Sequence, residues 1–191
     1  MQSLPIDMIN AWMMYEIRSI RGIFLIEIRV KMMKKRQDKK LKICFAASSG
    51  GHYEQLMMLK PLMDEYDSFV ITEKTKYKTK AKGEKTYYLK QVNRKEKNFL
   101  FAMLFNLVKS IKIYTKEKPD VIICTGVLAM IPMCLIMKLC RKKLIYIESF
   151  AKVTSATQTG KLLYKFADRF YVQWESMLNV YPDAIYMGGI Y

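Results

Sequence analysis

The sequence predicts an α/β fold in which helices cover both faces of a parallel sheet. Short apolar runs, typical of strands buried on both sides, alternate with helical patterns along residues 41–191. Such alternation indicates parallel strands joined by right-handed crossovers. With 191 residues and 51% hydrophobic content, the chain is long enough to bury one core, so we expect one domain and an N-terminal appendage.

Residues 1–40 are expected to form that appendage. Apolar residues recur at helical spacing from Ile6 to Ile28, but interspersed charges argue against a clean membrane span. A lysine-rich stretch follows, which could bind anionic lipid or serve as a solvated linker. Three interpretations of the helical part stay open: an amphipathic helix at a membrane surface, a helix packed on the domain, or an upstream extension that is not translated.

Residues 41–59 hold the first strand and the loop in which we expect chemistry. The apolar run 41–47 predicts a buried strand, and a helical pattern starts near His52, with Pro61 kinking or ending that helix. Glycines in the intervening loop permit positive φ and close approach, and a helix N-terminus favours phosphate groups. His52, the only histidine, belongs to the residue type best suited to act as a base near neutral pH. The alternative is a tight connection without chemistry.

Several classes of site are disfavoured. The loop has no G-x-G-x-x-G pattern and no P-loop lysine, which argues against a nicotinamide or ATP site, and no cofactor is expected. Four cysteines lie in apolar segments without C-x-x-C spacing, so we expect small core residues of a reduced protein: Cys44, Cys124, Cys134 and Cys140. With one histidine and no cysteine pair, no metal site is expected.

The helix predicted at 97–117 has the clearest apolar periodicity in the chain. Phe101 and Phe105 widen its apolar face, which we interpret as core, with contact to a membrane or another chain as the alternative. The other predicted strands are at 68–72, 86–89, 121–124, 143–147, 169–172 and 184–187, and the other predicted helices are at 127–140, 160–167 and 174–180.

Three loops directly follow predicted strands, at 48–52, 125–126 and 148–150. Ligands of open parallel sheets bind beyond the carboxyl ends of the strands. We therefore expect these loops to converge at one edge.

The net charge of +16, from 33 basic and 17 acidic residues, points to anionic partners. A membrane surface and a phosphorylated substrate both fit. Nucleic acid does not, because no recognisable module appears and the lysines are not interleaved with aromatic residues.

Four blocks of sequence carry a family resemblance: FAASSGGHYEQL, KPDVIICTG, YIESFAKVTSATQTGKLLYKFADRFYVQW and YPDAIYMGGIY. They resemble the small membrane-associated subunit of two-component glycosyltransferases. That family includes the anchoring subunit of the UDP-N-acetylglucosamine transferase of dolichol-linked oligosaccharide synthesis and bacterial relatives in capsule and exopolysaccharide assembly. The resemblance covers residues 41–191 and not 1–40. The Gly-Gly-His loop also resembles the acceptor-side loop of the peptidoglycan N-acetylglucosaminyltransferase.

The resemblance implies half of an enzyme. The chain would be a Rossmann-like domain equivalent to the N-terminal half of a GT-B glycosyltransferase, inactive alone, at the cytoplasmic face of the membrane as a peripheral or weakly anchored protein. A donor-binding glycosyltransferase subunit would complete a heterodimer and hold the UDP-sugar. The acceptor would be a polyprenyl-diphosphate-linked sugar, and transfer would invert the anomeric carbon.

The resemblance also suggests roles for single residues. His52 is the first candidate for the base and Glu148 the second, although either could instead orient the acceptor or hold a loop. The residues expected to bind the acceptor are Ser48, Ser49, Gly50, Gly51, Gly126 and Ser149. The competing function is a non-catalytic membrane scaffold that recruits the partner. A stand-alone α/β enzyme is disfavoured, because the chain has no standard phosphate motif for a nucleotide.

Overall fold

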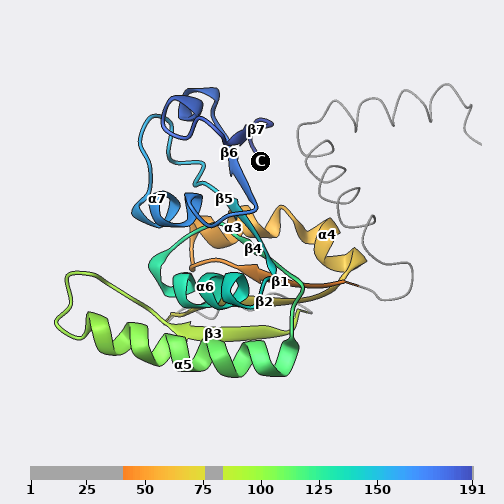
Figure 1. Ribbon diagram of the computed structural model, residues 1–191, viewed down its shortest axis with the longest axis vertical. Helices are drawn as coiled ribbons and strands as arrows, with labels where there is room; N and C mark the ends of the chain where they lie inside the picture. Colours follow the sequence, from red (N-terminus) through yellow and green to blue (C-terminus); the bar gives the residue numbers. More distant parts are fainter. Residues whose placement is uncertain (1–40, 76–83, 191) are drawn as a thin grey trace, which may run out of the picture.

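A computed structural model describes residues 41–75 and 84–190 of the chain. The predictions for residues 1–40 lie outside this range. The described residues form a seven-stranded parallel sheet in the order β3-β2-β1-β4-β5-β6-β7 (Figure 1). This arrangement confirms the predicted Rossmann-like fold.

All seven predicted strands are present, and their bounds lie close to those expected. The strands are β1 (Lys42–Ala46), β2 (Asp67–Lys74), β3 (Thr86–Lys90), β4 (Val121–Cys124), β5 (Lys143–Ile147), β6 (Arg169–Val172) and β7 (Ile185–Tyr186). The helices are α3 (Gly51–Met57), α4 (Lys60–Glu65), α5 (Phe99–Glu117), α6 (Ile131–Leu139) and α7 (Gln158–Tyr164), with short 3₁₀ helices η1 (Leu128–Met130) and η2 (Glu175–Asn179). The helix predicted at 174–180 is thus one 3₁₀ segment.

The first helical segment is divided, but not at the predicted residue. Helix α3 ends at Met57 and α4 begins at Lys60, so Pro61 stands in the first turn of α4. Proline is tolerated there because that turn has no intrahelical partner for the missing N–H group. Pro61 therefore starts a helix and does not end one.

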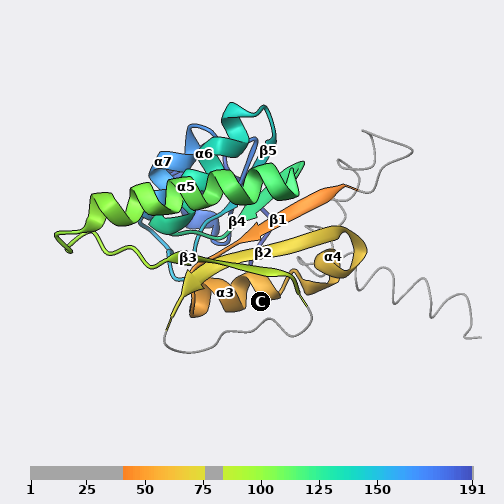
Figure 2. The ribbon, with the colours of Figure 1, turned by 90° about the horizontal axis from the view of Figure 1, so that it is seen from below.

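Helices cover both faces of the sheet. Figure 2 shows α3 and α4 on one side and α5, α6 and α7 on the other. Along β1, Ile43 and Phe45 pack toward α3 and α4, whereas Cys44 and Ala46 belong to the cluster on the opposite face. Parallel strands need such cover, since both of their faces are apolar.

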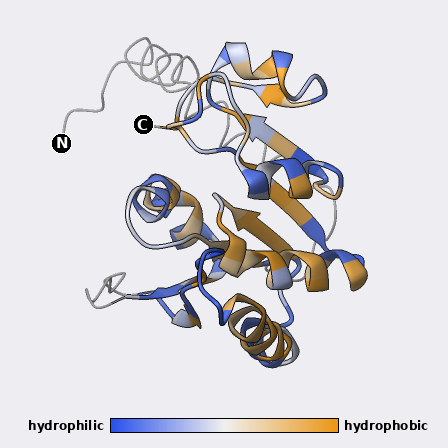
Figure 3. Ribbon diagram, turned by 90° about the vertical axis from the view of Figure 1, so that its left-hand side faces the viewer, coloured by the Kyte–Doolittle hydropathy of each residue, from blue (hydrophilic) through white to orange (hydrophobic). Residues whose placement is uncertain are grey.

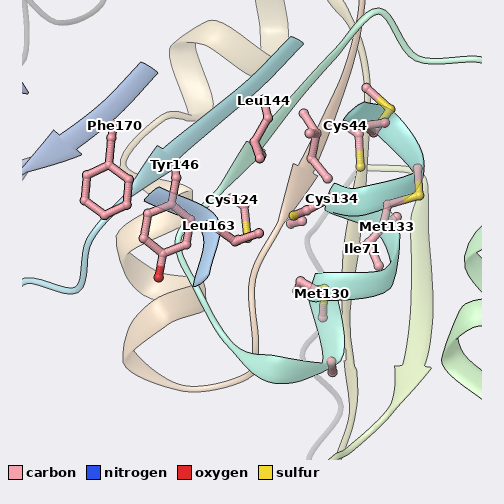
Figure 4. Close-up of a cluster of buried hydrophobic side chains, with 14 of the residues drawn as sticks. Cys44, Ile71, Cys124, Met130, Met133, Cys134, Leu144, Tyr146, Leu163 and Phe170 are labelled. Carbon is pink, nitrogen blue, oxygen red and sulfur yellow. The ribbon is translucent and has the colours of Figure 1, made fainter. Parts of the chain in front are cut away.

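The cysteine prediction is confirmed for three residues and wrong for one. Cys44, Cys124 and Cys134 are fully buried in the cluster between the sheet and α6 (Figure 4), where burial raises the pKa of the Cys44 thiol. Cys140 is exposed, because it follows the last residue of α6 at the point where the chain turns back toward β5. Within residues 41–75 and 84–190, no three His, Cys, Asp or Glu side chains are grouped to hold a metal ion.

The predicted core face of α5 is the outer face of the protein, so that expectation is wrong. Ala102, Asn106, Ser110, Ile113 and Glu117 are buried against the domain, while seven other large apolar side chains of the helix project outward. On the inner face, Asn106 pairs with the backbone of Lys90 and Glu117 with Lys42 and Lys85, and these contacts fix the helix in this orientation. No described helix combines the length and the apolar character that crossing a membrane requires.

Candidate functional site

The sheet places the three predicted loops at one edge. Strand order reverses between β1 and β4, which are neighbours, and all seven strands run in parallel. The crevice beyond the carboxyl ends of strands at such a switch point is the usual ligand site of an open α/β sheet. The loops after β1, β4 and β5 leave the sheet at this edge.

An open pocket of about 440 Å³ lies between the first turns of α3 and the loop that follows β5. Its lining residues are Gly51, His52, Gln55, Ser149, Phe150 and Ala151. Three predicted site residues, Gly51, His52 and Ser149, therefore share one pocket although 97 residues separate Ser149 from His52. The expected convergence of these loops is confirmed.

His52 is held at the pocket by the loop that follows β1 and by the end of β4, the two strands at which the strand order reverses. Gly50 turns the chain into α3 with φ 78°, and the Thr125 hydroxyl, at the end of β4, donates to the His52 carbonyl at 2.9 Å. The imidazole lies against Gly126, where an added Cβ would stand 3.1 Å from Cε1 and 3.3 Å from Nδ1. Gly126, with φ 121°, thus makes room for His52 itself, whereas the sequence suggested room for a ligand.

Burial lowers the pKa of His52 below its ordinary value of 6.5. A backbone hydrogen bond with Thr125 and the negative charge of Glu148 act in the opposite direction. The Nδ1 atom is shielded from solvent and has no side-chain hydrogen bond within the described chain. A protonated imidazole must satisfy two donors, so these surroundings favour the neutral ring, which is the form that can accept a proton.

We expect the imidazole of the folded protein to titrate below pH 6.5 and to return toward 6.5 on unfolding. Because the folded-state pKa is lowered, the stability associated with neutral His52 is present above pH 6.5 and is lost as the pH falls through the lowered pKa. Proton NMR of the untagged chain can follow this directly, since His52 is its only histidine. A pKa at or above 6.5 in the folded state would contradict the prediction.

Glu148 is buried behind the pocket and holds the loop that follows β5. Its side chain accepts hydrogen bonds from the Thr157 hydroxyl at 2.9 Å, the Ser149 N–H at 2.9 Å and the Tyr181 hydroxyl at 2.8 Å. The residue is only 1% exposed and does not line the pocket. These contacts match the loop-holding alternative for Glu148.

The other predicted acceptor-binding residues differ in placement. Ser48 is 5% exposed and its hydroxyl donates to the Ser49 carbonyl at 3.2 Å, so it lies inside the turn. Ser49 is half-buried and Gly50 is exposed, and neither lines the pocket. Gly51 and Ser149 are the two that the pocket reaches.

Sequence reasoning missed the residues that fix the pocket wall. Gln55 and Gln173 both donate to the Glu148 carbonyl, at 3.3 and 2.7 Å, and the Trp174 indole donates to the Phe150 carbonyl at 2.6 Å. Gln55 stands three residues after His52, on the same side of α3, and that spacing was an available signal. Gln173 and Trp174 end one of the blocks that carry the family resemblance, but that resemblance did not indicate their contacts with the loop after β5.

The family model described as "Oligosaccharide biosynthesis protein Alg14 like" matches residues 43–190. Curated relatives named UDP-N-acetylglucosamine transferase subunit ALG14 are similar over most of their length. The Yarrowia lipolytica protein is 31% identical, with 77% of this chain and 80% of that protein covered. The Schizosaccharomyces pombe protein is 30% identical, with 83% of this chain and 87% of that protein covered. The Homo sapiens protein is 24% identical, with 88% of this chain and 93% of that protein covered.

Solved structures with the same fold are longer chains. Acinetobacter baumannii MurG superposes with a TM-score of 0.59 at 16% identity, over 71% of this chain and 42% of MurG. UDP-N-acetylglucosamine 2-epimerase from Rickettsia bellii superposes with a TM-score of 0.62 at 10% identity, over 80% of this chain and 46% of the epimerase. The lipopolysaccharide outer core galactosyltransferase WaaB superposes with a TM-score of 0.54 at 12% identity, over 73% of this chain and 41% of WaaB. This chain therefore spans less than half of each, as expected for one half of a GT-B architecture.

Proposed function

The chain belongs to the Alg14-like family of oligosaccharide biosynthesis proteins, and from this premise we propose that it is the acceptor-side subunit of a two-component, inverting glycosyltransferase. A separate donor-binding subunit forms a heterodimer with it and holds a UDP-sugar. The curated relatives are named transferase subunits, and this chain covers 80–93% of the three described above. That match over nearly the full length supports a subunit role.

The observation that carries the proposal is the pocket that joins His52 to Ser149 at the strand switch. The pocket is open on one side, which suits a site completed by a second protein. A polyprenyl-diphosphate-linked sugar enters it with the acceptor hydroxyl toward His52 and its diphosphate toward Gly51 and Ser149. Residues 48–50 shape the turn that supports this diphosphate.

In the proposed reaction, His52 accepts the proton of the acceptor hydroxyl. The freed oxygen attacks the anomeric carbon of the donor sugar in line, a new C–O bond forms with inversion, and the bond to UDP breaks as UDP leaves. Glu148 acts as a positioning residue through the loop that carries Ser149 and Phe150. No cofactor of this chain takes part.

The names of the relatives make N-acetylglucosamine the first sugar to test. We further propose that the product belongs to a capsule or exopolysaccharide, as the sequence suggests, or to a lipid-linked oligosaccharide. In each case the acceptor is anchored in a bilayer, so the protein works at the cytoplasmic face of a membrane, and the charge of +16 favours anionic lipid there.

The test is transfer from radiolabelled UDP-N-acetylglucosamine to membrane lipid extract. This chain alone, its donor-binding partner alone, and the mixture are compared, with UDP-glucose and UDP-galactose as donor controls. We expect strong transfer only in the mixture. Full activity from this chain alone would reveal a donor site within it, and full activity from the partner alone would reject the two-component proposal.

A further inference from the structure

We propose that the outer face of α5 docks on an anionic lipid bilayer and lies in its interface. This inference deepens the proposed function and rests on it, because it names the surface through which the subunit meets a lipid-borne acceptor. The surface, called here the α5 face, consists of Leu100, Phe101, Leu104, Phe105, Leu107, Val108 and Ile111.

The α5 face is strongly apolar and open to solvent. Leu100 and Phe101 are 75% and 74% exposed, and Leu104 and Phe105 are each more than half exposed. No described element of the chain covers them. A contiguous exposed stripe of large apolar side chains marks an interaction site, since single exposed hydrophobic residues are the norm on soluble proteins.

Polar contacts on the opposite face prevent α5 from rotating this stripe inward. The Asn106 amide exchanges two hydrogen bonds with the backbone of Lys90, both at 2.8 Å, which joins α5 to the end of β3. Buried Glu117 binds the ammonium groups of Lys42 and Lys85, each at 2.7 Å. Rotating the helix would break these pairs and leave a buried charge without partners, so the outward orientation is fixed.

The charges around the stripe match anionic lipid. Lys109 and Lys112 flank it along the helix, and Lys109 reaches to 5.9 Å from the Phe105 ring. Further basic residues stand exposed at the two ends: Arg94, Lys95 and Lys97 before the helix, and Lys116 and Lys118 at its end. Glu96 is the only exposed acidic residue between positions 91 and 118. Leucine and phenylalanine rimmed by lysine are typical of helices that lie in a membrane interface, whereas protein interfaces are depleted in lysine.

The position of α5 connects this surface to the pocket. The helix begins after the carboxyl end of β3, at the same edge as the loops that follow β1 and β5. Figure 3 looks onto that edge, with α5 seen end-on at the bottom. The two most exposed residues of the α5 face, Leu100 and Phe101, lie in the first turn of the helix, so a bilayer on this face adjoins the edge at which the acceptor enters.

Vesicle flotation of the full chain tests this inference. Vesicles of phosphatidylcholine with phosphatidylglycerol are compared with phosphatidylcholine alone. We expect the double variant Phe101→Ser, Phe105→Ser to lower the partition coefficient on anionic vesicles by about tenfold or more. The matched control is Leu139→Ser, which removes an apolar side chain 83% exposed at the end of α6 and should leave binding unchanged. Thermal unfolding confirms that each variant is folded.

Binding unaffected by the double variant would overturn the proposal, as would equal loss in the Leu139→Ser control. A double variant that floats normally but no longer associates with the donor-binding subunit, or with a second copy in size-exclusion chromatography, would assign the α5 face to a protein and also overturn it. Flotation needs no turnover, so the result stands whether or not transfer is observed. Conversely, the variant should retain transfer to a short-chain acceptor in detergent.

Discussion

Replacing His52 with alanine should lower the transfer rate of the two-subunit complex by about 10²–10⁴-fold, the usual contribution of a general base. The loss should appear in kcat and not in KM. The imidazole accepts the proton in the transition state, whereas the groups that bind the acceptor in the ground state stay in place. Wild-type transfer should also fall on acidification below pH 6.5, where protonation removes the base, and the lowered pKa of His52 places that limb on the acidic side of the ordinary histidine value.

The matched control is Glu54→Gln, two residues further along α3 and exposed to solvent. It should leave transfer unchanged, which would show that disturbing the helix surface is not enough. Full transfer by folded His52→Ala protein would reject the base assignment. The competing scaffold function would then account for the protein, with recruitment of the partner as its contribution and the pocket as a passive surface.

The site could be located from the sequence because a topological rule applies. Short apolar runs followed by Ser-Ser-Gly-Gly, Thr-Gly and Glu-Ser predict strands that end in loops, and parallel strands bring such loops to one edge. The contacts that decide each role are long-range. Glu148 looked like a second base because it follows a strand directly, but its partners Thr157 and Tyr181 stand nine and 33 residues further along the chain, and no local pattern connects them to it.

The orientation of α5 could not be predicted for a different reason. Helical periodicity shows that one face is apolar, and this pattern is the same for a helix that faces the core and for one that faces a membrane. The orientation of α5 is decided by the partners that the residues on its polar face find in other elements. Asn106 meets Lys90 and Glu117 meets Lys42, and both pairs form only when the sheet is assembled.

Replacing Gly160 with alanine should lower the free energy of unfolding by about 3–5 kcal/mol, the range for breaking a buried charged network. An added Cβ would stand 2.1 Å from Oε2 of Glu148, 2.6 Å from the Tyr181 hydroxyl and 2.8 Å from Oγ1 of Thr157. All three neighbours belong to the network that holds the loop after β5. The Glu148 carboxylate would have to move away from its donors while remaining buried.

The matched control for Gly160→Ala is Gly51→Ala, also at the start of a helix, where an added Cβ meets no atom within 4 Å. We expect its stability to be unchanged or higher by less than about 1 kcal/mol. Urea unfolding of both variants decides the comparison. A double-mutant cycle sharpens it: Glu148→Ala should cost clearly less in the Gly160→Ala background than in the wild type, because the same network is lost only once. Additive costs would mean that Gly160 acts independently of Glu148, and the loop that forms one wall of the pocket would then be held by other contacts.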